Sequence, residues 1–309
     1  MKLEELKGVS KEVIEKLKEK GFKKVEEIMV MDSDTLAAML NISKSGATRI
    51  INACRAQYRP ELKPLEQIEK EWKELGRLTT GSKNLDDLLG GGLLFQSMTE
   101  LAGEYATGKT QSVFTFTVMA IASGYSVIFI DTERTVRPGR LKEIAEHRGV
   151  NPEDVAKYTY VIEAERTNEL SSVIDRLCDV IREFNQNNPD RPVGLVVVDS
   201  LIGPIRSDFR GRGQLQERQQ VLGHITQELL RIAKECNCVV VFTNQVYQKP
   251  DLFGGTVPVG GETLWHKAQY RLFYRRSKGN KRIVRILDAP DLPPRETVIV
   301  INEKGIDDA

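Results

Sequence analysis

The sequence has no long apolar run: no stretch of 18 or more apolar residues occurs, and its start, Met-Lys-Leu-Glu-Glu, carries no apolar signal region. These absences argue against a transmembrane helix and a secretory signal peptide. Cysteine is scarce, with four residues in 309, and no Cys or His cluster completes a zinc site. We therefore expect a soluble, intracellular, cytoplasmic protein with no membrane partner. The thiols expected to be buried and reduced are Cys54, Cys178, Cys236 and Cys238.

Neither sign of charge is in excess, because 45 basic residues face 44 acidic ones and leave a formal net charge of +1. A uniformly basic surface is therefore excluded, and any surface that binds nucleic acid must be a local patch. With 40% hydrophobic residues the chain can bury a sizeable core. Its length predicts about two domains.

What the sequence does contain is a phosphate-binding loop that matches G-x-x-x-x-G-K-[ST]. The loop lies between an apolar run typical of a strand and a helical segment, which is the context the motif requires. Its backbone N–H groups would bind phosphates at the helix N-terminus, Lys109 would add a positive charge, and the Thr110 hydroxyl could ligate Mg²⁺. The expected nucleotide contacts are Gly103, Glu104, Tyr105, Ala106, Thr107, Gly108, Lys109, Thr110 and Gln111.

Residues 1–58 are predicted to form a domain of short helices separated by tight glycine turns. Ser10 is a good N-cap for a helix over 11–20. The turns at 8–10 and 42–46, each followed by a helix, suggest helix-hairpin-helix units. Such units present backbone N–H groups to a DNA phosphate without reading bases. A small helical protein-binding domain is the alternative.

Residues 59–75 are predicted to be a linker, because two prolines interrupt the helical pattern. Residues 76–309 alternate strands and helices, as in an α/β core with a mostly parallel sheet, and beyond 265 the period of two predicts an antiparallel extension. The expected buried parallel strands are 97–102, 125–131, 158–162, 193–199 and 238–243. The helices expected between them are 110–122, 140–148, 169–185 and 216–235.

Polar side chains end three of these strands. Asp199 follows an apolar strand and would lie in the crevice at its carboxyl end, where it could hold Mg²⁺ beside the phosphate-binding loop. We expect Glu133 to be the general base that orients the attacking water, and Gln245 to sense the γ-phosphate. Taken singly, Asp199 is more typical of a helix cap. The alternatives are a carboxylate that caps the following turn for Glu133 and turn chemistry for Gln245.

Two segments rich in arginine or glycine predict contacts with DNA. An arginine cluster such as that at 205–218 would neutralise backbone phosphates. The long glycine-rich segment 247–261 has the composition of a loop that becomes ordered on binding a strand. Solvated loops are the alternative for both. The expected DNA contacts are Arg206, Arg210, Arg212, Arg218, Lys249, Phe253, Gly260 and Gly261.

These segments, in this order, resemble the RecA-type strand-exchange recombinases, namely the archaeal RadA proteins and their eukaryotic counterparts. The resemblance covers nearly the whole chain, and the segments that carry it include 79–83, 103–111, 131–133, 198–200, 217–220, 243–246, 288–290 and 303–306. It implies a RecA-like P-loop ATPase core. It also implies a DNA-dependent ATPase that binds single-stranded DNA and promotes homologous pairing and strand exchange in recombinational repair.

The resemblance also implies partners and residue roles. ATP and Mg²⁺ would lie between neighbouring subunits of a filament or ring. Glu133 matches the catalytic glutamate, and Arg140 matches the arginine that stacks on adenine. The segment from Asp288 to Pro290 matches the cap that a neighbouring subunit lays over the nucleotide. The two arginine- or glycine-rich segments match the first and second DNA-binding loops, and the helical domain would engage double-stranded DNA.

The chain departs from the family pattern in two places above all. The linker motif by which each subunit docks on the next is usually Phe-x-x-Ala, whereas the matching place here is Leu62-Lys-Pro-Leu65. The loop interior is Tyr105-Ala106-Thr107, where archaeal relatives usually carry Phe-Gly-Ser. A recombination mediator, a paralogue that keeps ATP but forms no long filament, is therefore the alternative function. A relative of circadian-clock proteins or hexameric helicases with the same core is a third possibility.

Overall fold

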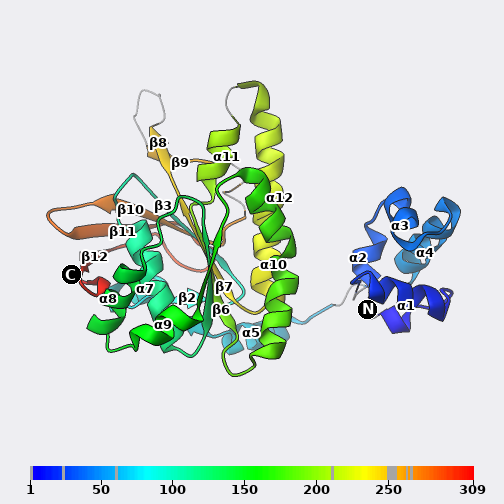
Figure 1. Ribbon diagram of the computed structural model, residues 1–309, viewed down its shortest axis with the longest axis horizontal. Helices are drawn as coiled ribbons and strands as arrows, with labels where there is room; N and C mark the ends of the chain where they lie inside the picture. The colour runs from blue at the N-terminus through cyan, green and yellow to red at the C-terminus, as the bar shows by residue number, and fades with distance from the viewer. Residues whose placement is uncertain are drawn as a thin grey trace. The chain divides into compact units, whose positions relative to one another are not determined.

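The computed structural model describes residues 3–22, 25–59, 62–209, 212–248, 256–261, 264 and 267–309. The chain divides into two compact units, residues 1–72 and 73–309 (Figure 1). In the described part of the chain, no helix combines the length and the apolar character that crossing a bilayer requires.

In its described residues the first unit forms only helices, namely η1 (Leu3–Glu5), α1 (Lys11–Glu19), α2 (Val25–Met29), α3 (Ser33–Leu40) and α4 (Lys44–Gln57). The expected cap is confirmed, because Ser10 Oγ accepts a hydrogen bond from the Val13 N–H. Ser43 caps α4 in the same way, so this helix begins three residues earlier than its apolar pattern indicates. Leucine, isoleucine, valine and alanine side chains from all five helices form one core, together with Cys54.

Helix α5 (Leu65–Glu74) lies within the segment expected to be a linker and spans the boundary between the two units. None of its residues is buried. Leu62 and Leu65, the two leucines of the docking motif, are 92% and 81% exposed. The helix therefore contributes little to either core.

The second unit is built on a nine-stranded sheet with the order β13-β12-β11-β10-β3-β7-β6-β4-β5. Its strands are β3 (Met98–Gly103), β4 (Ser126–Asp131), β5 (Thr159–Glu163), β6 (Val193–Asp199), β7 (Val239–Asn244), β10 (Tyr270–Arg276), β11 (Lys281–Asp288), β12 (Glu296–Asn302) and β13 (Gly305–Asp308). The six strands from β10 to β5 are parallel, and β11 to β13 extend the sheet in antiparallel fashion. The predicted fold class is confirmed.

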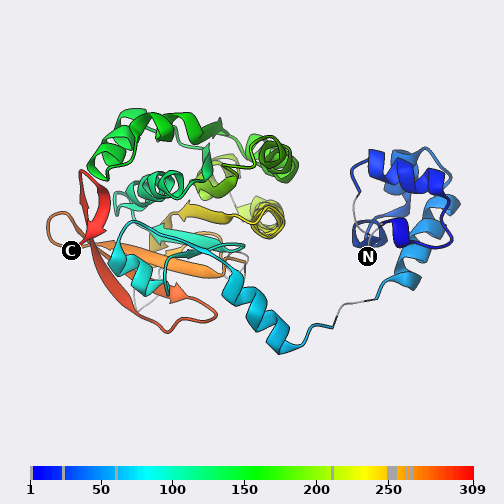
Figure 2. The ribbon, with the colours of Figure 1, turned by 90° about the horizontal axis from the view of Figure 1, so that it is seen from below.

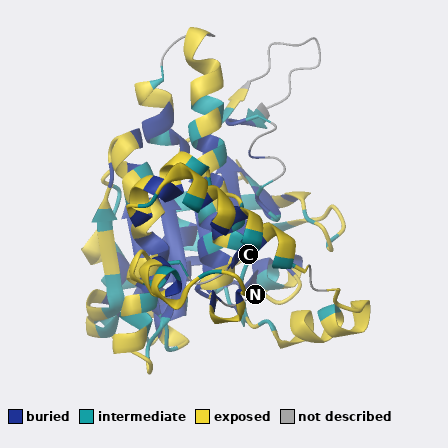
Figure 3. Cartoon of the chain, turned by 90° about the vertical axis from the view of Figure 1, so that its right-hand side faces the viewer, coloured by how far each residue is buried: buried dark blue, intermediate teal, exposed yellow. Residues whose placement is uncertain are grey.

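Helices cover both faces of this sheet (Figures 1 and 2). Alternate residues of each strand point to opposite sides, so Phe129 joins one core and Ile130 the other. Helices α7 (Lys109–Ala122), α8 (Pro138–His147) and α9 (Pro152–Tyr158) pack in the first core, and α10 (Thr167–Asn187), α11 (Ile202–Asp208) and α12 (Leu215–Glu235) in the second. The central strands are accordingly buried while the outer helix faces are exposed (Figure 3).

Smaller elements complete the second unit. Helix α6 (Lys83–Leu88) packs near β12 and β13, and β1 (Arg77–Leu78) pairs with β2 (Leu93–Leu94). Strands β8 (Val246–Gln248) and β9 (Thr256–Pro258) form an antiparallel pair after β7.

Three local predictions were wrong. The strand expected to be buried at 158–162 is the edge strand β5, which has a neighbouring strand on one side only, and Tyr160 and Val161 are 40% and 45% exposed. The segment around Arg206 was expected to be a loop but belongs to α11. The segment 247–261 was expected to be a loop throughout, yet β8 and β9 pair at its two ends. Helix α9 and strand β13 were not predicted at all.

Candidate nucleotide-binding and catalytic site

The phosphate-binding loop connects β3 to α7 at the carboxyl edge of the sheet. Gly108 adopts φ 101° at the N-cap of α7, and Ala106 adopts φ 57°. A Cβ on Gly103 would lie 2.6 Å from the carbonyl oxygen of Tyr274, and one on Gly108 would lie 2.7 Å from Ile301 Cδ1. Close packing against the backbone therefore requires glycine at 103, and the left-handed backbone favours it at 108.

Lys109, the first residue of α7, folds its side chain over the loop. Its Nζ donates hydrogen bonds to the carbonyl oxygens of Gly103 and Glu104, each at 2.8 Å. Burial lowers the pKa of Lys109, although Asp199, Glu133 and Glu104 act in the opposite direction. The ammonium is thus held at the point where the phosphates of a nucleotide would meet the loop.

A cavity of about 690 Å³ lies over this loop. It is lined by the nine predicted loop residues together with Glu133, Thr135, Asp199, Ser200, Thr243, Gln245, Val246, Arg282 and Ile301. The structure therefore brings the loop, the acid at the end of β6, the glutamate after β4 and the amide after β7 into one site. These residues converge because β3, β4, β6 and β7 run parallel and end at the same edge.

Asp199 is a buried carboxylate, 3% exposed. It accepts hydrogen bonds from the hydroxyls of Thr243 and Thr135, the latter at 3.2 Å. Burial raises the pKa of Asp199, and the hydroxyls of Thr243, Thr110 and Thr135 oppose that shift. A carboxylate and the Thr110 hydroxyl are hard oxygen donors of the kind that Mg²⁺ prefers. A divalent cation here would compensate the cost of burying the charge.

Glu133 follows β4, and its Oε1 accepts a 2.7 Å hydrogen bond from Ser200 Oγ. Asp131, two residues earlier, has a structural role instead. Its carboxylate accepts hydrogen bonds from the backbone N–H groups of Thr135 at 3.0 Å and Val136 at 2.9 Å. The loop is thereby folded around Asp131, and Glu133 is the acid that remains directed at the cavity.

Gln245 lines the nucleotide cavity and also a second cavity of about 390 Å³ beside it. Glu133 is shared between the two cavities in the same way. The other residues of the second cavity are Thr132, Glu165, Gly203, Pro204, Arg206 and Ser207. Arg206 Nη1 donates a hydrogen bond to Gln245 Oε1 at 3.3 Å. Two residues predicted for different functions are thus in contact.

Arg140, expected beside the adenine, lies on α8 next to the start of α7. Its guanidinium donates to Gln111 Oε1 at 2.9 Å, to Glu143 Oε2 at 2.8 Å and to the backbone carbonyl of Asn302. The contact with Gln111 places it at the end of the phosphate-binding loop. It is outside the lining of the cavity itself.

Asp288 and Pro290 are not brought to the cavity of their own chain. Asp288 is exposed at the end of β11, whereas Arg282 near the start of that strand lines the cavity. The length of the strand therefore separates them from the nucleotide site within one chain.

The residues expected to contact DNA are only partly described. Arg206 is exposed on α11, and Arg218 is partly exposed on α12. Gly260 is buried, and a Cβ there would lie 2.2 Å from Leu264 Cδ1, so its glycine is needed for packing. Gly261 follows it in the left-handed region with φ 59°. Arg210, Lys249, Phe253 and the side chain of Arg212 lie outside the described residues.

Six residues of the nucleotide cavity were not predicted from the sequence: Thr135, Ser200, Thr243, Val246, Arg282 and Ile301. Thr243 and Ser200 could have been found, because each is a polar residue at or just after the carboxyl end of a buried strand. Arg282 and Ile301 come from the C-terminal strands and carry no local signal.

In the first unit, the two predicted hairpin turns lie together. A cavity of about 400 Å³ is lined by Gly8, Val9 and Ser10 from one turn and by Ile42, Ser43 and Gly46 from the other, with Val13, Arg49 and Ile50. The start of α1 and the start of α4 therefore meet at one place, with the cation of Arg49 beside them.

Comparisons with known proteins agree with these two units. Residues 71–309 match the Rad51 family, and residues 1–56 match the SAM-like helix-hairpin-helix tandem family. The chain is 38% identical over 315 residues to the DNA repair and recombination protein RadA of Metallosphaera sedula, and the match covers 99% of this chain and 95% of that protein. The chain therefore belongs to the Rad51 family, and its resemblance to the archaeal RadA recombinases is confirmed.

Proposed function

We propose that the chain is a DNA-dependent ATPase that assembles on single-stranded DNA and promotes homologous pairing and strand exchange. Family membership assigns it to homologous recombination and DNA repair. The observation that carries the ATPase proposal is the single cavity in which Lys109, Asp199, Glu133 and Gln245 meet the phosphate-binding loop. Its work on DNA would put the protein in the cytoplasm with the nucleoid.

The residues fit ATP and Mg²⁺. The backbone N–H groups of the loop and the start of α7 would hold the phosphates, with the Lys109 ammonium between them. Thr110 and Asp199 would hold Mg²⁺, which neutralises charge that develops on the phosphate oxygens. In the described part of the chain, no three His, Cys, Asp or Glu side chains form a metal cluster. Mg²⁺ needs none, since it is usually bound by one or two protein ligands, water and phosphates.

Glu133 and Gln245 would complete the catalytic site. Glu133 would accept the proton of a water molecule while the water oxygen attacks the γ-phosphorus. The bond from that phosphorus to the β,γ-bridging oxygen breaks, which gives ADP and inorganic phosphate. Gln245 would contact the γ-phosphate, and its position after β7 connects it directly to the β8–β9 pair of the second DNA loop.

We place DNA at three regions of the chain. The Arg206–Arg218 segment and the segment after Gln245 would hold single-stranded DNA, the first by charge and the second by ordering around it. The helical unit would engage double-stranded DNA. Its match to a helix-hairpin-helix family and the meeting of both hairpin turns beside Arg49 support that role.

We also propose self-association as a filament or ring. Leu62 and Leu65 are nearly fully exposed, which suits side chains that dock on a neighbouring copy. Asp288 and Pro290 could cover a nucleotide only on another copy, because they lie away from their own cavity. In functional terms we divide the chain into a DNA-binding domain (1–58), a docking linker (59–75) and an ATPase core (76–309).

A pairing assay tests the proposed function. The protein is incubated with a single-stranded oligonucleotide, ATP and Mg²⁺, and a supercoiled duplex that contains the same sequence is then added. We expect joint molecules that require both ATP and homology, so a heterologous duplex and Lys109→Ala protein serve as controls. If no joint molecules form although the protein is folded and binds ATP, the recombinase function is contradicted.

Electron microscopy of the same mixture distinguishes a filament from the mediator alternative. The match to RadA over nearly its whole length does not favour that alternative.

A further inference from the structure

Helix α11 contacts both of the residues that we assign to ATP hydrolysis. It begins three residues after Asp199, and its last turn carries Arg206, the first arginine of the first DNA loop. Gly203, Pro204, Arg206 and Ser207 of this helix line the cavity that also contains Glu133 and Gln245. A single short helix thus joins the DNA segment to the nucleotide site.

The first connection runs through Ser200. Its hydroxyl donates to Glu133 Oε1 at 2.7 Å, while its oxygen accepts the backbone N–H of Gly203 at 3.1 Å. Ser200 is 4% exposed, so solvent does not compete strongly for these bonds. The first turn of α11 is therefore hydrogen-bonded, through one hydroxyl, to the carboxylate that would activate water.

Gly203 leaves no room for a side chain. A Cβ at this position would lie 2.8 Å from Glu133 Oε1 and 3.0 Å from Ser200 Oγ. Gly203 has no positive φ, so its backbone does not require glycine. Glycine is needed at 203 because the Glu133 carboxylate lies so close to it. Because the displaced atoms belong to the ends of two movable side chains, a methyl group here would move the carboxylate rather than disrupt the fold.

The second connection is the 3.3 Å hydrogen bond from Arg206 Nη1 to Gln245 Oε1. Arg206 is exposed and lies in the last turn of α11, where the Arg206–Arg218 segment begins. A DNA phosphate is a stronger acceptor for a guanidinium than a neutral amide oxygen. A phosphate that takes the Nη1 donor of Arg206 would therefore free Gln245 Oε1.

We propose that Ser200 and Gly203 are positioning residues for Glu133, and that Arg206 is a positioning residue for Gln245. Helix α11 thereby couples the first DNA loop to ATP hydrolysis. Without DNA, Arg206 holds Gln245 toward α11, and with DNA the amide is free to turn to the γ-phosphate. This inference rests on the proposed function, since it assumes that DNA stimulates ATP turnover.

Gly203→Ala tests the first connection, and Gly139→Ala is its matched control. Gly139 is also helical, and a Cβ there meets nothing within 4 Å. We expect Gly203→Ala to lower kcat at least about tenfold while KM for ATP changes less than about twofold, because the general base is displaced and the phosphate loop is untouched. Its melting temperature should not fall, because alanine favours a helix over glycine. Equal kcat values for the two variants would overturn the assignment of Gly203.

Ser200→Ala separates the hydrogen bond from the steric effect. Loss of the donor should lower kcat with little change in KM, in the same direction as Gly203→Ala. An unchanged kcat in a folded Ser200→Ala protein would show that the hydroxyl does not position Glu133.

Arg206→Ala tests the second connection, with Arg176→Ala, an exposed arginine on α10, as its control. We expect ATP turnover without DNA to rise about threefold in Arg206→Ala, because one hydrogen bond to Gln245 is removed. Simple loss of a DNA contact would lower only the DNA-stimulated rate, so an unchanged or lower rate without DNA would overturn the role assigned to Arg206.

If wild-type protein shows no stimulation by a single-stranded oligonucleotide, the proposed function fails. If it is stimulated but the variants match their controls, only the coupling through α11 fails.

Discussion

The ammonium of Lys109 lies 2.8 Å from the carbonyl oxygen of Gly103, six residues before it at the start of the same loop. The bond closes the loop on itself and satisfies a cation that burial disfavours, as the lowered pKa of Lys109 indicates. Nucleotide phosphates would replace the backbone carbonyls as partners of the Lys109 ammonium.

Lys109→Ala should therefore abolish catalysis. We expect kcat for ATP hydrolysis to fall about a hundredfold or more, because a preorganised positive charge is lost from the developing phosphate charge. Phosphate release at saturating ATP measures the effect, and circular dichroism confirms the fold. A variant that retains more than about a tenth of wild-type kcat would contradict the role assigned to Lys109.

Asp199→Asn should separate stability from activity. The buried carboxylate carries a desolvation cost, seen in its raised pKa, which an amide of the same shape avoids. In the absence of Mg²⁺ we expect the variant to melt at a higher temperature than the wild type. The increase should be about 2–4 °C for each kcal/mol gained in the free energy of unfolding. It should also be inactive, because a ligand for Mg²⁺ is lost. A variant that is destabilised in the absence of Mg²⁺ would show that Asp199 is a structural acceptor for Thr243.

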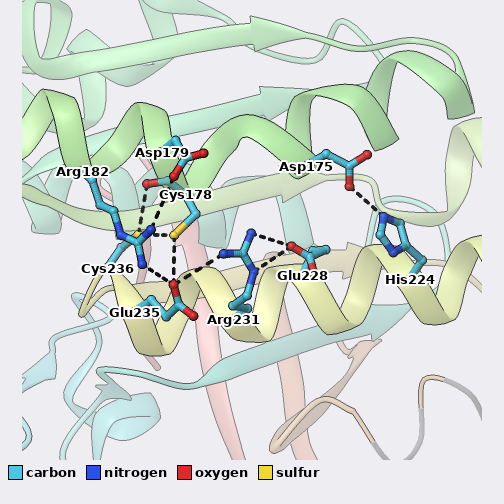
Figure 4. A network of polar contacts seen from close by, with 9 residues as sticks. All are labelled: Asp175, Cys178, Asp179, Arg182, His224, Glu228, Arg231, Glu235 and Cys236. Carbon is cyan, nitrogen blue, oxygen red and sulfur yellow. Dashed lines mark hydrogen bonds and ion pairs between the residues drawn. The ribbon is translucent and has the colours of Figure 1, made fainter. Parts of the chain in front are cut away.

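The four cysteines should be unreactive in the native protein. All four are free and buried, and Cys178 Sγ lies 3.4 Å from Cys236 Sγ within the α10–α12 polar network (Figure 4). Burial raises the pKa of Cys236 to about 12 and that of Cys54 to about 11. We expect a disulfide reagent at pH 8 to modify no thiol rapidly in native protein and all four in denaturant. Rapid native modification of any cysteine would contradict this arrangement.

The same burial predicts a pH dependence of the first unit. Folding raises the pKa of the Cys54 thiol from its ordinary value of 9.0 to about 11. Between these values the folded chain binds more protons than the unfolded chain, so the free energy of unfolding falls as pH rises. Cys54→Ala should reduce this fall between pH 9 and about pH 11, as measured by denaturant unfolding. An identical slope for the variant would place the titrating group elsewhere.

Much of the fold follows from local pattern. The strand predicted at 193–199 is β6 with the same bounds, because a run of apolar and small residues ends in an aspartate. The exposure of β5 could not be predicted, since an edge strand and a central strand carry similar apolar residues and only the sheet order distinguishes them. Helix α11 was missed because its glycine and proline are typical of loops.

The site shows a similar division. Residues at strand ends were predictable because parallel strands bring their carboxyl ends together. Arg282 was not, because it reaches the cavity through pairing of the C-terminal strands. The left-handed backbone of Ala106 and Arg134 also has no sequence signal, since such a backbone favours glycine. The Arg134 guanidinium forms an ion pair with Glu165, and this ion pair connects the loop that carries Glu133 to the segment after β5.

The contacts of Arg148 predict how the C-terminal strands are held to the core. Its guanidinium donates to the carbonyl oxygens of Gly81 at 2.9 Å, Lys304 at 2.7 Å and Ile306. Arg148→Ala leaves these carbonyls without that donor, and we expect it to lower the free energy of unfolding by about 2 kcal/mol. Denaturant unfolding measures this, with the exposed Arg176→Ala as control. Equal stability of the two variants would show that the hydrogen bonds of Arg148 do not hold β13 to the core.

The most direct test of the coupling between the nucleotide cavity and DNA is to measure ATP turnover with and without a single-stranded oligonucleotide. If the nucleotide cavity is coupled to DNA binding, phosphate release by the wild-type protein must rise when the oligonucleotide is added. Lys109→Ala must lack both the basal and the DNA-stimulated release of phosphate. Turnover that is the same with and without DNA, in protein that binds the oligonucleotide, would contradict a DNA-dependent ATPase.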